Sequence, residues 1–308
     1  MNKIDKDFYK LIDYLKNTSK EELIDVSINR YKGYTQEYRT EFEKEANNTL
    51  GIMRFGKISE KENDYTLIKN RVSTLLGGLR GIEDFYDLLE DYRSKKTLMI
   101  ILYNLVNFNP KILDVVKEKL FNEYFDMDII DTDRIGVYVD GGAYIGDTIE
   151  MFFKYFSGKK IIGYEITENV FKILQSNVKK YGDYVEIRNV GLGRGYETKF
   201  VKEEWNIVGN HLGDEGDYKV SIVPLDGDIK EKVAVIKLDV EGSEYEALSG
   251  AENIIKRDKP QLIVCLYHNL EDIYVLPQLI HEFRPDYKFY LRYYGDCLRP
   301  LDYVLYAI

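Results

Sequence analysis

Three short segments of the chain combine residue types and spacings that suit ligand binding, and the first runs from 139 to 148. Asp140 ends an apolar run there, and the small residues Gly141, Ala143 and Gly146 follow it. Small residues let the backbone approach a ligand closely, and the N–H groups of a following helix point into the same space. The loose GxAxxG pattern also suits a dinucleotide, so NAD(P) is an alternative ligand. We favour S-adenosylmethionine, because a carboxylate would repel a diphosphate but can accept a hydrogen bond from the methionine ammonium, directly or through water.

Carboxylates also mark the other two segments. Glu165 ends the next apolar run, about 20 residues further on, where an open α/β sheet places an acidic residue that accepts hydrogen bonds from ribose hydroxyls. Asp239 directly follows the run 233–238 and precedes Glu241 and Glu244. A helix N-terminus would favour the two glutamates by dipole compensation, but Asp239 comes before the helix begins. We therefore expect Asp239 at the ligand-binding edge of the sheet.

A mostly parallel sheet would bring these segments together. From residue 131 onward, short apolar runs alternate with helical patterns, which indicates βαβ units and a Rossmann-like α/β fold with seven strands. The expected strands are 137–140, 161–165, 184–189, 233–238, 262–266, 288–292 and 303–307. The expected helices are 148–156, 169–180, 244–256 and 270–283, and an insertion at 196–223 should add two short strands.

The first half of the chain has a different pattern. Apolar residues recur at intervals of three and four from about residue 5 to 126, which predicts helices. Pro110 predicts the start of a helix that continues to 121, and glycines at 77, 78 and 81 predict a break between helices. We expect an N-terminal helical domain at 1–130 and a second domain at 131–308. The first would act as a substrate cap, as a dimerisation element, or only as a cover for apolar surface.

Composition narrows the classes of protein further. The 308 residues are 44% hydrophobic and 31% charged, as in ordinary globular proteins. The formal net charge of -10, without a basic cluster, argues against a general nucleic-acid binder. The apolar run 98–106 is far shorter than the ~20 residues that span a bilayer, and the N-terminus lacks the apolar stretch of a secretory signal, so we expect a cytoplasmic protein. Cys265 and Cys297 form no disulfide or zinc pattern and are expected to be packing residues.

In their order along the chain, these segments resemble the FkbM family of S-adenosylmethionine-dependent methyltransferases. The family pattern has a DxGAnxG loop, an FEP strand end, a strand ending near Asn, a VP-x-LD segment, a K-I-D-V-E-G-x-E stretch and a Y-x-x-x-LR element. The corresponding segments here are 140–146, 164–166, 189–191, 223–226, 237–244 and 287–292. The sequence departs from the pattern at Tyr144, where Asn is usual, and at Ile166, where Pro is usual. The resemblance covers 137 to the C-terminus and implies a class I methyltransferase fold.

This resemblance implies transfer of the methyl group of S-adenosylmethionine to an oxygen or nitrogen of a small or glycan-like acceptor, such as a sugar in surface glycan biosynthesis. By position, Asp140, Gly142 and Gly146 would border the methionine part of the cofactor. Glu165 would border the ribose, residues 189–191 the adenine edge, and Asp239 the reacting centre. The full expected set of cofactor-binding residues is Asp140, Gly142, Ala143, Tyr144, Gly146, Asp147, Thr148, Glu165, Ile166, Asn189, Val190, Gly191 and Asp239.

An acceptor hydroxyl would need a base that faces the methyl group, because the sulfur leaving group itself needs no proton. We favour Asp239 or His268 as the catalytic residue, since a histidine has an unperturbed pKa near 6.5. A capping hydrogen bond is the alternative role for His268. Substrate contacts are expected from Glu241, from Asn269 and from His211, which lies in an insertion that could fold over the acceptor.

Several alternatives stay open at this point. Asp239, Glu241 and His268 together offer donors that suit a hard cation such as magnesium, although Glu241 can instead support the loop, and the metal is left unassigned. A nicotinamide-dependent oxidoreductase is the alternative enzyme, disfavoured by Asp140 and by the lack of an evident hydride-transfer pair. A non-catalytic module that assembles with partner enzymes through its helical half is the alternative from another class. A homodimer through that half is also an expectation, whereas nucleic acid and a membrane span are not.

Overall fold

The computed structural model describes residues 2–48, 55–202, 211–213 and 215–308. Its contacts divide the chain into two units. One comprises Met1–Asn122, Leu266–Gln278 and Lys288–Leu305, and the other comprises Glu123–Cys265, Leu279–Tyr287 and Tyr306–Ile308. Across the described ranges, no helix has both the length and the apolar character needed to cross a bilayer.

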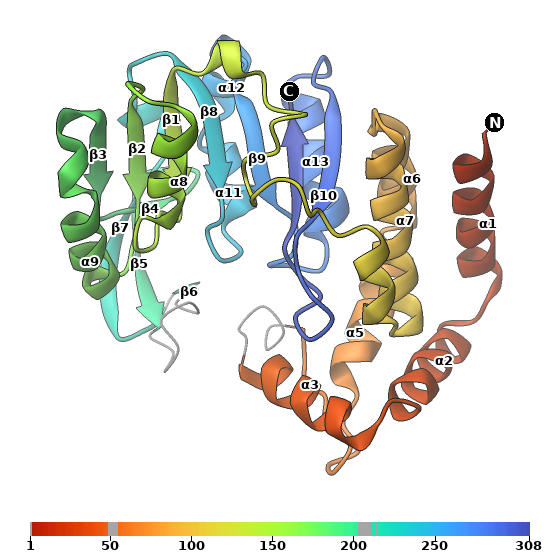
Figure 1. The fold of residues 1–308 in the computed structure, drawn as a ribbon. Coiled ribbons are helices and arrows are strands. Elements are labelled where there is room, and N and C mark those ends of the chain that lie inside the picture. Colours follow the sequence, from red (N-terminus) through yellow and green to blue (C-terminus); the bar gives the residue numbers. More distant parts are fainter. Residues whose placement is uncertain (1, 49–54, 203–210, 214) are drawn as a thin grey trace. The chain divides into compact units, whose positions relative to one another are not determined.

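The main sheet has seven strands in the order β10-β11-β9-β8-β1-β2-β3 (Figure 1). They are β1 (Val137–Gly141), β2 (Ile161–Tyr164), β3 (Val185–Arg188), β8 (Val233–Leu238), β9 (Gln261–Cys265), β10 (Phe289–Tyr293) and β11 (Tyr303–Ala307). Strand β1 pairs parallel with β2 and β8, and the pairs β2·β3 and β8·β9 are parallel as well. The predicted seven-stranded, mostly parallel α/β fold is confirmed.

The central strands are continuously buried. In β2 and β9 every residue is buried, and in β1 only the first residue is partly accessible. Such continuous apolar runs are typical of parallel strands that are covered on both faces, which is why the sequence pattern identified them. The helices in this half of the chain are α8 (Asp147–Tyr155), α9 (Glu168–Val178), α10 (Leu225–Asp228), α11 (Glu244–Ser249), α12 (Glu252–Asp258) and α13 (Asp272–Phe283).

The helix predicted at 244–256 is divided in two, so that prediction is wrong at Gly250. The backbone of Gly250 lies against another loop, and a Cβ on it would come within 1.9 Å of the carbonyl oxygen of Gly193. A new helix then begins, because the carboxylate of Asp226 accepts hydrogen bonds from the N–H groups of Asn253 and Ile254 at 2.9 and 2.8 Å. This contact between distant segments has no signature within 244–256 itself.

The predicted insertion forms a second sheet with four strands in the order β4-β7-β5-β6. They are β4 (Gly191–Leu192), β5 (Glu197–Lys202), β6 (His211–Gly213) and β7 (Tyr218–Val223). The expectation of two short strands in 196–223 is too low, since β5, β6 and β7 all lie there. Val201, Val220 and Ile222 form a small buried cluster, and Ile166 and Tyr218 pack on it. Only alternate residues of β7 are buried, which makes such a strand harder to recognise than a continuous apolar run.

The first unit is mainly helical through residue 107, as predicted. Its helices include α1 (Lys3–Asn17), α2 (Lys20–Lys32), α3 (Gln36–Asn48), α5 (Thr66–Gly77), α6 (Leu79–Leu88) and α7 (Tyr92–Asn107). The side chains of Asn2, Ser19 and Asp91 cap α1, α2 and α7 by accepting a hydrogen bond from the backbone N–H three residues further on. The predicted glycine break lies between α5 and α6, but Gly81 belongs to α6, where a Cβ would come within 2.8 Å of Gln278.

The helix predicted from Pro110 to 121 is wrong beyond its first turns, because only Pro110–Val115 is helical, as a 3-10 helix. The carboxylate of Glu118 accepts hydrogen bonds from the N–H groups of the next two residues at 2.8 and 2.6 Å, which diverts them from a helical pattern. The N–H of Glu118 donates to the carbonyl oxygen of Tyr293 at 2.7 Å. Leu120 of the predicted apolar stripe is 80% exposed, so burial does not stabilise a helix there.

Strand β10 is joined to α7 within the first unit. The N–H of Leu291 donates to Ser94 Oγ at 2.9 Å. The guanidinium of Arg292 also donates to Ser94 Oγ, and it pairs with Asp91 at 2.7 Å. Because Arg292 is buried, this ion pair supplies the counter-charge that a buried cation needs.

Candidate functional site

The three predicted segments meet at one edge of the main sheet. In the paired register, Gly141 of β1 faces Tyr164 of β2 and Leu238 of β8. Because these strands are parallel, the residues that follow them emerge at the same carboxyl edge, where ligands bind in open α/β sheets. Glu165 and Asp239 are two of those residues, so the structure brings them to the loop that follows β1.

That loop is tight and closely packed. The N–H groups of Gly142 and Ala143 both donate to the carbonyl oxygen of Tyr164, at 3.0 and 2.9 Å. Gly142 has a φ of +77°, and a Cβ on it would lie 1.8 Å from the carbonyl oxygen of Asp239. Only glycine combines this backbone conformation with such a close approach. The end of β1 therefore rests directly on the end of β8.

The predicted loop residues after Gly142 differ in accessibility. Ala143 is buried, whereas the side chain of Tyr144 is exposed. Gly146, with a φ of +92°, precedes α8, whose first residues are the exposed Asp147 and the buried Thr148. A cavity of about 240 Å³ adjoins this helix start and is lined by Ile145, Gly146, Asp147, Glu150, Asn177, Lys180 and Tyr181.

The carboxylate of Asp140 is fully buried, whereas the sequence argument placed it within reach of a ligand. Its Oδ1 lies 3.0 Å from Lys237 Nζ, and its Oδ2 has no hydrogen-bond partner in the described part of the chain. Burial raises the pKa of Asp140 to about 6, although the ammonium of Lys237 acts in the opposite direction. A ligand ammonium would reach this carboxylate only through a bridging water or a movement of the loop. The role of Asp140 as a cofactor-binding residue therefore stays a prediction.

Lys237 is a residue for which the sequence analysis assigned no role, although a single charge within the apolar run 233–238 is a signal. Besides Asp140, its Nζ contacts the carbonyl oxygens of Gly141 and Gly142 at 3.2 and 2.9 Å. An ammonium group has three protons, so these three acceptors satisfy it. Burial lowers the pKa of Lys237, but the carboxylates of Asp140 and Asp239 outweigh burial and raise it above its usual value. Lys237 is therefore protonated, and its ammonium group stabilises the loop after β1.

Glu165 directly follows β2, and both of its carboxylate oxygens accept hydrogen bonds. Oε2 accepts one from the N–H of Tyr144 at 3.1 Å, and Oε1 accepts one from the N–H of Thr167 at 2.7 Å. Burial raises the pKa of Glu165, against the effect of these two N–H groups. A carboxylate has about four lone-pair sites, so ribose hydroxyls can still donate to it.

The segment predicted at the adenine edge lies next to Glu165. Asn189 Nδ2 donates to the carbonyl oxygens of Glu165 and Ile166 at 2.8 and 3.2 Å. Val190 is half-buried, and Gly191 is buried as the first residue of β4. Ile166, where the family pattern has Pro, packs on the apolar cluster of the second sheet. The ends of β2 and β3 are thus tied to each other at the predicted cofactor edge.

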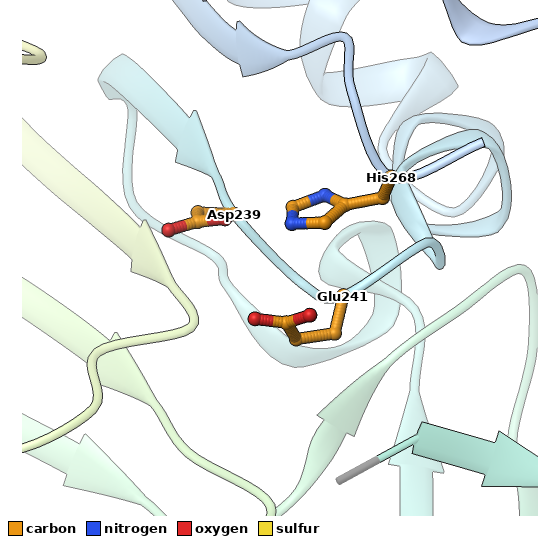
Figure 2. Close-up of side chains that lie close together, drawn as sticks. All are labelled: Asp239, Glu241 and His268. Atoms are coloured by element: carbon orange, nitrogen blue, oxygen red, sulfur yellow. The ribbon is translucent and has the colours of Figure 1, made fainter. Parts of the chain in front are cut away.

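Asp239, Glu241 and His268 lie close together (Figure 2). One possible ligand atom of each lies within 4.8 Å of the others. The two carboxylates are half-buried and the imidazole is buried. Glu241 has a φ of +53°, a backbone conformation that is uncommon for a residue with a side chain. This set of groups can take up a proton, and its donor types are also those that divalent cations accept.

The two other residues expected to contact the substrate are Asn269 and His211, and the structure describes the side chain of Asn269 alone. Asn269 is held at the start of α13, since its backbone N–H and its Nδ2 both donate to Asp272 Oδ2, at 2.9 and 3.0 Å. His211 is the first residue of β6, and its side chain lies outside the described part of the chain. Neither contact with a substrate is tested by this geometry.

Tyr124 is a second residue that the sequence analysis missed. Its hydroxyl donates to Asp239 Oδ2 at 2.9 Å and lies 3.7 Å from Cys265 Sγ. Burial, followed by the charge of Asp239, raises the pKa of the Cys265 thiol well above its usual value, which suits a packing residue. In a chain with 27 tyrosines, a single tyrosine near the end of the helical pattern at 5–126 carries no signal.

Comparison with known proteins finds one matching family model and several similar solved structures. A family model described as a methyltransferase FkbM domain matches residues 140–293. Among solved structures, a methyltransferase FkbM from Methylobacillus flagellatus KT is similar with a TM-score of 0.66 and 24% sequence identity. The similarity covers 77% of this chain and 62% of that protein, and at this identity it supports the fold alone. A search of curated proteins finds no match.

Two further solved structures are similar only at low TM-scores, which give no information about function. An rRNA methylase from Streptococcus thermophilus has a TM-score of 0.38 and 14% identity, covering 58% of this chain and 89% of that one. Fibrillarin from Aeropyrum pernix, in complex with S-adenosyl-L-methionine, has a TM-score of 0.36 and 10% identity, covering 56% of this chain and 66% of that one.

Proposed function

This chain belongs to the methyltransferase FkbM domain family, and we propose that it is an S-adenosylmethionine-dependent O- or N-methyltransferase. The acceptor that we propose is small or glycan-like, with a sugar hydroxyl or amino group as the methylated position. The observation that carries this function is the loop of small residues after β1, packed against the end of β8 and beside Glu165 at one edge of a parallel sheet.

The residues at this edge suit the cofactor. The buried Oδ2 of Asp140 lacks a hydrogen-bond partner within the described ranges, so it can accept a hydrogen bond from a bridging water that also contacts the methionine ammonium. Glu165 can accept hydrogen bonds from the ribose, and residues 189–191 beside it can border the adenine. When bound, S-adenosylmethionine supplies a methyl group on a positively charged sulfur.

The remaining tasks of the chain are to orient the acceptor and to take up its proton. Asp239 and His268 are the proposed bases, because each can accept a proton near neutral pH when its environment tunes it. Glu241 and Asn269 would contact the acceptor. The proposed role for the N-terminal helical region is a substrate cap or a dimer contact, and a divalent cation at Asp239, Glu241 and His268 is an additional hypothesis based on their donor types.

Isothermal titration calorimetry tests the proposed cofactor. We expect S-adenosylmethionine and S-adenosylhomocysteine to bind with micromolar dissociation constants, and NADH not to bind, since Asp140 puts a carboxylate where a diphosphate would need donors. Binding of NADH without binding of either sulfur nucleotide would instead indicate an oxidoreductase. Mass spectrometry of glycan precursors incubated with the protein would then identify an acceptor by the mass of one added methyl group.

Replacing Glu165 with alanine should weaken the binding of S-adenosylhomocysteine roughly 10- to 100-fold. The variant loses the proposed ribose acceptor and also leaves the N–H groups of Tyr144 and Thr167 without their partner. Calorimetry measures the affinity, and Glu168→Ala, at an exposed position nearby, is the matched control. An unchanged affinity in Glu165→Ala would remove the ribose assignment.

The affinity for S-adenosylhomocysteine should rise as the pH rises from 5 to 7. Asp140 has a pKa of about 6, so its carboxyl group is mainly neutral at pH 5 and mainly ionised at pH 7, where it attracts the ligand ammonium. The Asp140→Asn variant cannot ionise and should show no such rise. If calorimetry finds the same rise in this variant, another titrating group is responsible and Asp140 does not serve the ammonium.

A further inference from the structure

Tyr124 connects the two parts of the site that act on the cofactor and on the acceptor. Its hydroxyl donates to Asp239 Oδ2 at 2.9 Å, at the end of β8. Its ring faces the ammonium of Lys237, with Nζ 4.9 Å from the ring centre. That ammonium in turn contacts Asp140 and the carbonyl oxygens of the loop after β1. One side chain thus touches both the group that holds the loop and the carboxylate proposed at the reacting centre.

The backbone conformation of Tyr124 is unfavourable for a residue with a side chain. The residue has a φ of +66°, in the left-handed region, where a bulky side chain is disfavoured. Its side chain is nonetheless nearly buried, between Lys237, Asp239 and Cys265. A strained residue persists when its surroundings determine its conformation, and such residues cluster at functional sites. Tyr124 also precedes the range 140–293 that the family model matches, so the family pattern assigns it no role.

We propose that Tyr124 is a positioning residue that fixes the carboxylate of Asp239 toward the reacting centre, a role that rests on the proposed function. A hydrogen bond to Oδ2 restricts rotation of the carboxylate and leaves Oδ1 in a defined direction. The ring over Lys237 restricts the tyrosine in turn, because a cation is attracted to the face of an aromatic ring. The end of β8 and the loop after β1 are thereby held in one arrangement.

This role predicts a difference between the two forms of the cofactor. S-adenosylmethionine carries a positive charge on sulfur and S-adenosylhomocysteine does not, so a carboxylate fixed near the sulfur favours the first over the second. Tyr124→Phe keeps the ring over Lys237 and removes only the hydroxyl. We expect this variant to bind S-adenosylmethionine roughly three- to tenfold more weakly and to bind S-adenosylhomocysteine as the wild type does.

The test is a double-mutant cycle measured by calorimetry with both ligands. The variants are Tyr124→Phe, Asp239→Asn and the two combined. If Tyr124 acts through Asp239, the combined variant should bind S-adenosylmethionine no more weakly than Asp239→Asn alone. The control is Tyr138→Phe, in which the removed hydroxyl is buried without a hydrogen-bond partner among the described residues, and whose affinities for both ligands should equal those of the wild type.

Three results would overturn the proposed role of Tyr124. These are an unchanged affinity for S-adenosylmethionine in Tyr124→Phe, an equal loss for both ligands, and a combined variant that binds more weakly than Asp239→Asn. A wild-type chain that binds neither ligand would be a different result, since it would reject the proposed function itself and this inference with it.

Discussion

Replacing Gly142 with alanine should weaken the binding of S-adenosylhomocysteine at least ~100-fold and lower the melting temperature of the protein. The new Cβ would lie 1.8 Å from the carbonyl oxygen of Asp239, and the backbone φ of +77° disfavours any side chain. The loop and the end of β8 would have to separate, which removes the close approach on which the cofactor site depends. Calorimetry and thermal unfolding would measure the two effects.

Gly195 offers a matched control for that substitution. A Cβ on Gly195 meets no atom within 4 Å, and its φ is not in the left-handed region. Gly195→Ala should therefore change neither the cofactor affinity nor the melting temperature measurably. Full affinity in Gly142→Ala would show that the loop is not the cofactor site, whereas equal losses in both variants would attribute the effect to alanine itself.

Replacing Lys237 with methionine should lower the free energy of unfolding by about 3–5 kcal/mol, which corresponds to a fall of ~10 °C in melting temperature. The substitution leaves the buried carboxylate of Asp140 without its counter-charge, and it leaves the carbonyl oxygens of Gly141 and Gly142 without a donor. Thermal and denaturant unfolding would measure the loss. The exposed pair of Lys256 with Glu252 provides the control, because breaking it should cost less than about 1 kcal/mol.

A double substitution distinguishes the loss of the ion pair from the loss of side-chain packing as the cause of the lower stability. Removing both charges, in Asp140→Leu combined with Lys237→Met, should recover most of the lost stability, because neither charge is then buried alone. If the combined variant is less stable than Lys237→Met, the ion pair is not the cause of the loss. The combined variant should still bind S-adenosylhomocysteine weakly, since the loop carbonyls have lost their donor.

The architecture of the second half could be predicted because its determinants are local. Strands such as 233–238 are buried and, apart from Lys237, apolar, since helices cover parallel strands on both faces, and glycines mark where β1 ends. The placement of Glu165 and Asp239 at one edge follows from the parallel order of the strands, which the alternation of strand and helix already implies. The sequence was therefore sufficient to place Glu165 and Asp239 at the same edge of the sheet.

The parts that could not be predicted depend on contacts between distant segments. The buried carboxylate of Asp140 pairs with Lys237, almost a hundred residues away, and the hydrogen bond from Tyr124 to Asp239 spans a similar separation in sequence. The carboxylate of Glu118 ends a helical pattern that looks regular in sequence, because the neighbouring N–H groups turn toward it and its own N–H pairs with Tyr293. The spacing of apolar residues within a short stretch of sequence gives no information about such distant contacts.

The ion pair between Asp91 and Arg292 limits how this chain can be divided or recombined. Residues from both ends of the sequence complete one compact unit, and the guanidinium of Arg292 is only 3% exposed. A fragment cut at residue 131 would keep this guanidinium and lose its counter-ion. A chimera that exchanges the N-terminal helices between relatives would therefore need to exchange β10 with them, because the compact unit that contains this ion pair is discontinuous in sequence.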